Sequence, residues 1–323
     1  MLDEAQFNRL DDLIDRDADA RGASDLLLQL LQDDSVRYVL AHDSKLLARA
    51  ASTAPRITLL PAAELPPTDA VAYLGRLAVD HPEAPAGTRL VLVQPAYSEV
   101  GPNGDIPGRD DLAWLNPRRS ATPLHELDSA LWLQAQALIN WHESHRYCPN
   151  CGSVTEVHQG GWSRWCAGCS RQLFPRTDPA IIVAVTDSRD RLLLGSQAAW
   201  EPNRWSILAG FVEAGETLEA AVGREVFEES GVRLASIEFV RSQPWPFPHS
   251  LMFGFEARAT DGCELRPDGQ EIAALRWFTR AELLAERDEL LLPGHASIAR
   301  KLIERWLGQP LDGEIEPDFE VQS

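Results

Sequence analysis

The sequence predicts an α/β protein whose main domain follows a four-cysteine zinc ribbon and a smaller, mainly-β N-terminal domain. Three observations predict this order. Short apolar runs rich in β-branched residues precede residue 100, two Cys-x2-Cys pairs lie near the middle of the chain, and strand-like runs alternate with helix-like segments after residue 173. A length of 323 residues suits about two domains.

The N-terminal domain is expected to span residues 1–146 and to be mainly β. Its first 22 residues are acidic and predict a helix or a frayed arm. The strand-like runs are residues 36–40, 57–60, 71–77 and 89–93. Glycine and proline cluster between residues 98 and 110, which indicates a loop. Apolar residues at helical spacing then predict a connecting helix over residues 124–145.

Residues 147–172 contain two cysteine pairs, Cys148 with Cys151 and Cys166 with Cys169. The 14 residues between the pairs are typical of a zinc ribbon with four thiolate ligands. Two disulfides or a redox pair are the alternatives, and the lack of a secretion signal disfavours disulfides. Four thiolates leave no open coordination position, so this zinc is expected to be structural.

The main domain is expected to span residues 173–308. A buried strand at residues 180–185 has its hairpin partner at 191–195, and a run at 206–209 leads into a glycine loop. The segments expected after the next helix are strands at 237–241, 251–257 and 274–278 and a terminal helix at 296–307. Residues 309–323 are rich in acidic side chains and predict a disordered tail.

The net charge of −19 argues against nonspecific binding of nucleic acids or membranes by the protein as a whole. It does not exclude an anionic substrate, because bound cations reverse the local field. No apolar run reaches 18 residues, and the first residues lack the basic and apolar regions of a signal peptide. We therefore expect a cytoplasmic protein without a membrane span.

The most informative segment is residues 210–232. Within it, Glu225 and Glu229 lie one helical turn apart and share a face of the expected helix. Leu218 and Val222 lie on much the same arc, so this face is not a plain solvated surface. Three carboxylates within five residues need a counter-charge. The usual one is a hard divalent cation with oxygen ligands, such as Mg²⁺ or Mn²⁺.

The ends of this helix carry recognisable signals. Thr217 is the expected N-cap, and Gly231 is the expected residue at which the helix stops. The alternative is a solvated acidic helix in which Arg224 pairs with Glu228 four residues later. The fixed spacing from the preceding glycine and from Glu216 favours a metal-binding motif instead.

A second segment with chemistry is residues 242–250, in which prolines alternate with aromatic residues. Each proline fixes φ and removes an amide donor, so the strip is expected to be extended and stiff. Trp245 and Phe247 offer flat faces for a planar ring, and Gln243 and Ser250 offer hydrogen bonds. From composition alone, a surface linker or a polyproline ligand is the favoured interpretation.

Residues 210–232 match every defined position of the Nudix box, G-x5-E-x7-R-E-U-x-E-E-x-G-U with U aliphatic. The S-Q-P-W-P-F-P-x-S strip and the C-P-x-C-G knuckle resemble the NADH pyrophosphatase subfamily of Nudix hydrolases. This resemblance covers roughly residues 30–308 and implies an α/β/α sandwich with a mixed sheet. It also implies cleavage of NADH or NAD⁺ to reduced or oxidised nicotinamide mononucleotide plus AMP, and a homodimer whose active site draws on both subunits.

The resemblance implies roles for individual residues as well. Metal binding falls on Glu225, Glu229, Glu271 and the backbone carbonyl of Ala209. Substrate contact falls on Phe174, Phe211, Gln243, Pro244, Trp245, Pro246, Phe247, Pro248, His249, Ser250 and Ala299. Phe211 matches an aromatic residue that stacks on nicotinamide. Phe174 stands where many relatives carry tyrosine, so it keeps stacking and loses a hydroxyl hydrogen bond.

The expected catalytic residues are Arg224, Glu225, Glu228, Glu229 and Glu271. In the hypothesis, Mg²⁺ or Mn²⁺ ions are held by Glu225 and Glu229, with Glu228 as an alternative further ligand. They polarise the pyrophosphate and activate a water that attacks one phosphorus in line. Either Glu228 or Glu271 accepts the proton. Arg224 is expected to orient the glutamates rather than to touch the substrate.

Three other functions are weighed against this one. The first is hydrolysis of another nucleoside diphosphate derivative such as ADP-ribose, which the proline-aromatic strip disfavours. The second is removal of NAD caps from RNA, which leaves a 5′-monophosphate by the same cleavage. The net charge disfavours broad RNA affinity, although a single-stranded 5′ end needs only a local groove. The third is noncatalytic nucleotide sensing, which the complete glutamate set disfavours.

Overall fold

The computed structural model describes residues 10–42, 45–49, 56–95, 109, 111–116 and 124–311. The chain separates into two compact units. Among the described residues, the N-terminal unit holds those from Leu10 to Arg176 together with Pro246–His249, and the C-terminal unit holds Thr177–Trp245 and those from Ser250 to Leu311. Most of the expected loop at residues 98–110 lies outside the described residues. The expected domain boundaries stay predictions.

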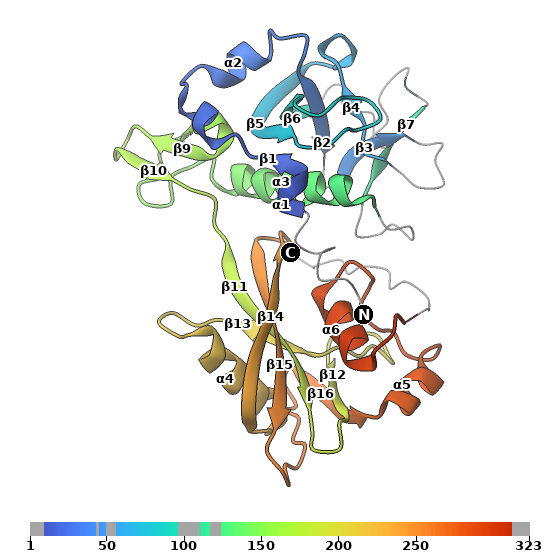
Figure 1. Ribbon diagram of the computed structural model, residues 1–323. Helices are drawn as coiled ribbons and strands as arrows, with labels where there is room; N and C mark the ends of the chain where they lie inside the picture. The colour runs from blue at the N-terminus through green and yellow to red at the C-terminus, as the bar shows by residue number, and fades with distance from the viewer. Residues whose placement is uncertain are drawn as a thin grey trace. The chain divides into compact units, whose positions relative to one another are not determined.

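The N-terminal unit is built on a seven-stranded sheet of order β1-β5-β6-β2-β3-β7, with β4 paired to β2 (Figure 1). The strands are β1 (Ile14–Asp15), β2 (Arg37–His42), β3 (Lys45–Arg49), β4 (Leu59–Leu60), β5 (Thr68–Leu77), β6 (Arg89–Pro95) and β7 (Leu112–Leu115). The expectation of a mainly-β region is confirmed. The strands β3 and β7 were not predicted, because each is short and lacks a clear alternating pattern.

Four helical segments accompany this sheet: α1 (Leu10–Leu13), the 3₁₀ turns at Ala18–Gly22 and Ala62–Glu64, and α2 (Leu26–Leu30). The long helix α3 (Glu126–Ser144) confirms the predicted connecting helix. Its apolar residues Leu127, Leu131 and Leu138 are fully buried against the sheet in one core cluster. The helix begins at His125, whose side chain accepts a hydrogen bond from the backbone of Leu127.

The zinc ribbon follows α3 as a three-stranded sheet of order β10-β9-β8. Its strands are β8 (Glu156–His158), β9 (Ser163–Cys166) and β10 (Arg171–Leu173). The sulfur atoms of Cys148, Cys151, Cys166 and Cys169 all lie within 4.8 Å of one another. Four sulfurs gathered this closely, without a disulfide among them, suit tetrahedral zinc.

The C-terminal unit is a six-stranded mixed sheet of order β14-β15-β11-β12-β16, with β13 paired to β11. The strands are β11 (Asp178–Thr186), β12 (Leu192–Gln197), β13 (Leu208–Phe211), β14 (Leu234–Trp245), β15 (Ser250–Ala259) and β16 (Ile272–Phe278), and the helices are α4 (Leu218–Ser230), α5 (Arg280–Glu286) and α6 (Ile298–Leu307). All strands predicted here are found, and α5 was not predicted. Strand β11 runs parallel to β15 and antiparallel to its other partners.

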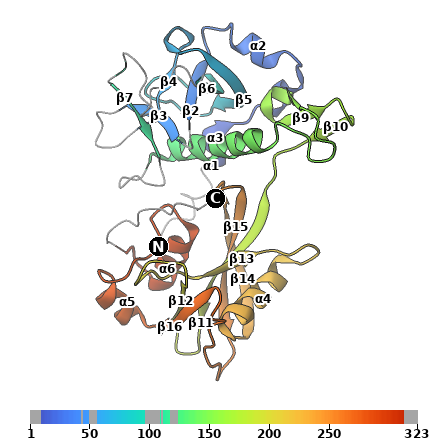
Figure 2. The same cartoon turned by 180° about the vertical axis from the view of Figure 1, so that it is seen from behind.

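Strand β11 organises this unit because its side chains alternate between two cores. Ile182 and Ala184 pack in the cluster that contains α6, whereas Ile181 and Val183 pack in the cluster that contains α4. Alternation with a period of two is the rule for a strand buried on both faces. The helices α4 and α6 therefore cover opposite faces of the sheet, as Figures 1 and 2 show from two sides. This is the expected α/β/α sandwich.

The C-terminal segment stays packed against the protein further along the chain than expected. The tail was expected to start at residue 309, but Leu311 is buried. Its amide donates to the carboxylate of Glu304, and its carbonyl accepts from Arg300, with both side chains buried on α6. Residues 312–323 lie outside the described residues. Among the helices that the structure describes, none is long and apolar enough to cross a membrane.

One buried histidine joins α3 to the ribbon. The Nε2 atom of His142 lies 2.8 Å from the carbonyl oxygen of Gly161. Its Nδ1 atom lies 2.8 Å from a guanidinium nitrogen of Arg164. Since Arg164 can only donate, Nδ1 must be the unprotonated nitrogen. Burial and the neighbouring positive charge lower the pKa of His142 to about 4.

Acidification should therefore destabilise the N-terminal unit. In the unfolded chain His142 binds a proton below about pH 6.5, while in the folded chain it stays neutral until about pH 4, so stability falls as the pH falls through this window. The loss between pH 7.5 and pH 5 should be about 2 kcal/mol. Urea unfolding of the zinc-loaded protein at both pH values measures it.

The matched variant is His142→Gln, which cannot titrate. Its stability should fall by about 2 kcal/mol less than that of the wild type over the same pH range, because only the titration of His142 has been removed. An equal loss of stability in the variant would show that the dependence has another source.

Candidate active site

Helix α4 positions the acidic residues of the site. It begins at Thr217, whose hydroxyl accepts from the amide of Ala220 at 3.2 Å, and ends at Gly231, which has a left-handed φ of 71°. Both predicted helix ends are confirmed. Val222 and Val226 are fully buried in the core shared with β11. The helix is therefore fixed on its apolar side, which sets the direction of its carboxylates.

Arg224 holds three of these carboxylates. Its Nε and Nη2 atoms each donate to a different oxygen of Glu216 at 2.9 Å. Its Nη1 atom donates to Glu225 at 2.9 Å and to Glu228 at 3.0 Å. Nη2 also donates to the backbone carbonyl of Phe211 at 2.9 Å. The bond to Glu216 is the main cause that raises the pKa of Arg224, and Arg224 in turn lowers the pKa of Glu216.

Gly210 and Glu225 are in direct contact. A Cβ atom on Gly210 would lie 2.1 Å from the carboxyl carbon of Glu225, far inside van der Waals contact. Only glycine therefore lets this carboxylate lie against the end of β13. Burial raises the pKa of Glu225 despite its bond to Arg224, and the charges of Glu228 and Glu271 add to this effect.

Glu229 is the most deeply buried acid of the site. Its side chain is 4% exposed, and Oε2 has no hydrogen-bond partner among the described residues. Burial, followed by the charges of Glu271 and Glu225, raises its pKa to about 8. A buried carboxylate oxygen without a donor, facing other acids, fits a divalent cation as the missing partner.

These oxygens are more widely spread than the zinc ligands. Among the described residues, the four cysteines alone form a group of three or more possible ligands whose atoms all lie within 4.8 Å of one another. Glu271 is exposed and follows Asp268, which accepts from the amides of Glu271 and Ile272. Asp268 was not predicted. Its Asp-Gly pair is a turn signal that could have marked the loop, and these backbone bonds lower its pKa.

The expected metal and aromatic residues lie in both units. Ala209 and Phe211 belong to β13, where Ala209 pairs with Ile182 and Phe211 pairs with Ala180. The side chain of Phe211 is 59% exposed, so its ring is accessible for stacking. Phe174 is 61% exposed but belongs to the N-terminal unit. Ala299 is buried in the first turn of α6.

The proline-aromatic strip is not extended throughout, which corrects the expectation. Strand β14 continues through Trp245, Pro246–His249 form a turn with a cis peptide bond between Phe247 and Pro248, and Ser250 opens β15. The strip folds back because β14 and β15 pair as a hairpin, with Trp245 opposite Ser250. Pro244 is tolerated because β14 is the first strand in the sheet order.

Most side chains of the strip have structural partners. Gln243 bonds to backbone atoms of Ala296 and Ile298. Phe247 packs against Trp132, with ring centroids 5.1 Å apart. The other residues expected to contact substrate differ in how exposed they are. Pro246 and Ser250 are buried, Trp245 and His249 are half-buried, and Pro244 and Pro248 are exposed.

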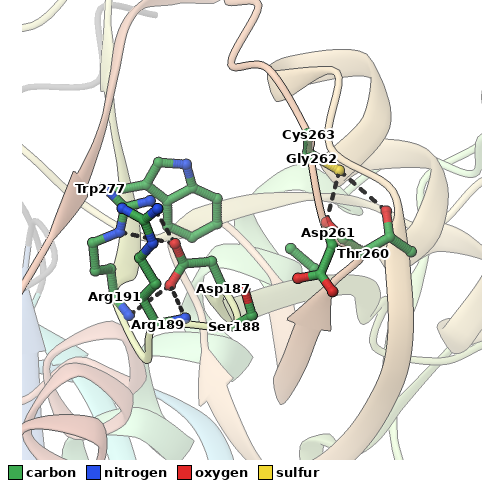
Figure 3. A pocket seen from close by; sticks show the side chains of 10 residues that line it. Asp187, Ser188, Arg189, Arg191, Thr260, Asp261, Gly262, Cys263 and Trp277 are labelled. Atoms are coloured by element: carbon green, nitrogen blue, oxygen red, sulfur yellow. Dashed lines mark hydrogen bonds and ion pairs between the residues drawn. The ribbon is translucent and has the colours of Figure 1, made fainter.

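A separate pocket of the C-terminal unit contains none of the predicted site residues (Figure 3). It is lined by the β11–β12 turn, the segment after β15 and Trp277. Asp187 lies at its edge with both carboxylate oxygens bonded to Arg191. Among the described residues, the side chains that line this pocket form no close group of three or more possible metal ligands.

Comparison with known proteins agrees with this geometry. Residues 176–305 match the family model of the NUDIX domain, and residues 143–174 match that of the NADH pyrophosphatase zinc ribbon domain. The ribbon therefore holds structural zinc, and the Nudix domain implies a further divalent metal. Among solved structures, a NUDIX hydrolase from Nitrosomonas europaea has a TM-score of 0.39 and 24% identity over 52% of this chain and 97% of that chain.

Two curated relatives extend the match beyond these domains. The NAD-capped RNA hydrolase NudC of Mycobacterium bovis is 37% identical over 287 residues, which cover 86% of this chain and 85% of that protein. The human NAD-capped RNA hydrolase NUDT12 is 37% identical over 205 residues, covering 59% of this chain and 44% of that protein. The chain therefore belongs to the Nudix hydrolases, in the NADH pyrophosphatase branch that carries a zinc ribbon.

Proposed function

We propose that this protein hydrolyses the pyrophosphate of NADH and NAD⁺ to nicotinamide mononucleotide, reduced or oxidised, and AMP, and that it removes NAD caps from the 5′ ends of RNA by the same cleavage. The observation that carries the proposal is the buried, unpartnered carboxylate of Glu229 beside Glu225 and Glu271. The names of the relatives supply the substrate.

Different residues of the chain bind the metal ions, position the glutamates and accept the proton. Glu225, Glu229 and Glu271, with the carbonyl of Ala209, hold the divalent cations, for which Mg²⁺ and Mn²⁺ are the best-suited ions with oxygen ligands. When bound, these cations neutralise the pyrophosphate and activate water. Arg224 fixes Glu225 and Glu228 in place. Either Glu228 or Glu271 accepts the proton, since both are exposed to solvent.

Aromatic side chains are suited to bind the ring systems of the substrate. The exposed rings of Phe211 and Phe174 and the half-buried Trp245 are suited to stacking. Phenylalanine at position 174 offers a ring face without a hydroxyl. A homodimer in the cytoplasm is part of the same proposal, and light scattering of the purified protein measures the oligomeric state.

Product analysis tests the function directly. The zinc-loaded protein with Mn²⁺ or Mg²⁺ should convert NADH to reduced nicotinamide mononucleotide and AMP, and NAD-capped RNA to RNA with a 5′-monophosphate. Release of free nicotinamide and ADP-ribose would show different chemistry. Faster turnover of ADP-ribose than of either NAD substrate would favour another Nudix specificity.

Glu229→Gln should lower kcat/KM by at least about a hundredfold, because it removes a charged ligand at the reacting phosphate. Its melting temperature without divalent metal should not fall, because ionised Glu229 is buried beside other acids. Steady-state kinetics and thermal unfolding with and without Mn²⁺ measure both effects. Glu219→Gln, on the exposed side of the same helix, is the control and should keep activity. Near-normal turnover by Glu229→Gln would contradict the assignment.

Gly210→Ala should fold but lose activity, by roughly tenfold or more, because the new methyl group displaces the carboxylate of Glu225. The matched control is Gly223→Ala in the middle of α4, where a Cβ meets no atom within 4 Å. That variant should gain about 0.5–1 kcal/mol of stability from the helix propensity of alanine and keep its activity. Equal activities of the two variants would show that the contact between Gly210 and Glu225 is dispensable.

A further inference from the structure

We propose that Asn140 of α3 is a positioning residue for the NAD(H) site, acting through the turn Pro246–His249, and that Gln243 has the same role at the other side of Trp245. The inference rests on the proposed function, because it assigns the strip around Trp245 to substrate binding. Neither amide needs to touch the substrate. Each instead fixes backbone that carries a substrate contact.

Asn140 directs both hydrogens of its side-chain amide at the turn. Its Nδ2 atom donates to the carbonyl oxygen of Pro246 at 2.8 Å and to that of Pro248 at 2.9 Å. Its Oδ1 atom accepts from Nε2 of Gln136, one turn earlier on α3, at 2.6 Å. An amide nitrogen carries two hydrogens, so each carbonyl receives one. Gln136 holds the amide in the orientation that directs both hydrogens at the turn.

The turn needs a donor from elsewhere because prolines remove its own. Pro244, Pro246 and Pro248 have no amide hydrogen, so alternate residues of the strip cannot donate. Pro246 is buried, and a buried carbonyl without a hydrogen-bond donor is destabilising. Asn140 supplies the missing donors. Phe247 adds an apolar anchor by packing on Trp132 and the core of the N-terminal unit.

Gln243 is fixed in a comparable way within the C-terminal unit. Its Oε1 atom accepts from the amide of Ile298, and its Nε2 atom donates to the carbonyl of Ala296, both at 2.7 Å. These atoms belong to the start of α6, directly before the expected substrate contact Ala299. Trp245 therefore lies between two anchored points of the chain, two residues after Gln243 and one residue before Pro246.

The test compares Asn140→Ala with Gln134→Ala. Gln134 is also an amide of α3 that bonds to a backbone carbonyl, that of Leu74 at 2.7 Å, but it does not bond to the turn. Asn140→Ala should raise KM for NADH about tenfold and leave kcat within about threefold. The lost hydrogen bonds fix the turn beside Trp245, which is expected to contact a ring of the substrate, and they do not act on the reacting phosphate. Gln134→Ala should leave both constants unchanged.

Hydrogen exchange supplies a readout independent of activity. In Asn140→Ala the amides of Phe247 and His249 should exchange at least about tenfold faster than in the wild type, and Gln134→Ala should leave them unchanged. Asn140→Asp keeps the size of the side chain but offers no amide hydrogen, so it should behave like Asn140→Ala. A wild-type KM in Asn140→Asp would show that shape alone holds the turn and would overturn the proposal.

Two further outcomes distinguish failure of the positioning role from failure of the proposed function. If the turn loosens but KM for NADH stays at the wild-type value, the positioning role is wrong. If the wild-type protein does not cleave NADH at all, the proposed function fails first, while the exchange data still report whether Asn140 holds the turn. Gln243→Ala should raise KM like Asn140→Ala, and an unchanged KM would remove Gln243 from the proposal.

Discussion

The structure of the active site depends on how Arg224 compensates acids that would otherwise repel one another. Its guanidinium group reaches Glu216, Glu225 and Glu228, and it also bonds to the backbone of β13. Glu229 lies outside this compensation. The acids of the site therefore include three that share one guanidinium group and one, Glu229, whose buried Oε2 atom has no hydrogen-bond partner among the described residues. Metal binding to the folded state then adds to the stability of the fold, because the unfolded chain has no such site.

The central sheet and the helices on its two faces fix the positions of these acids. Strand β11 divides its side chains between two cores, so α4 is fixed against one face of the sheet while α6 covers the other. The motif glycine and the motif glutamate are 15 residues apart in sequence, yet Gly210 and Glu225 touch. The spacing of the motif is therefore required by a contact between the end of a strand and a helix as well as by the positions of the expected metal ligands.

Local signals in the sequence predicted much of this structure, and contacts between distant residues explain what they missed. Thr217, Gly231 and the cysteine pairs act through neighbours a few residues away, so their roles were readable. The strip was expected to be extended because prolines favour that locally. Its turn instead depends on Asn140, more than 100 residues earlier. The partner of Gln243 lies 53 residues later, and Leu311 is held by the buried charged side chains of Arg300 and Glu304 on α6. The role expected for the exposed Glu271 rests on resemblance alone and stays a prediction.

The proline in β14 has a consequence beyond the site. Strand β14 begins the sheet order, and the outer edge of a terminal strand of this length is a template on which another chain can add a strand. Pro244 interrupts the row of amide hydrogens there, and Pro246 and Pro248 continue the interruption into the turn. The prolines that shape the hairpin therefore also reduce the number of amide donors with which another chain could pair along this edge.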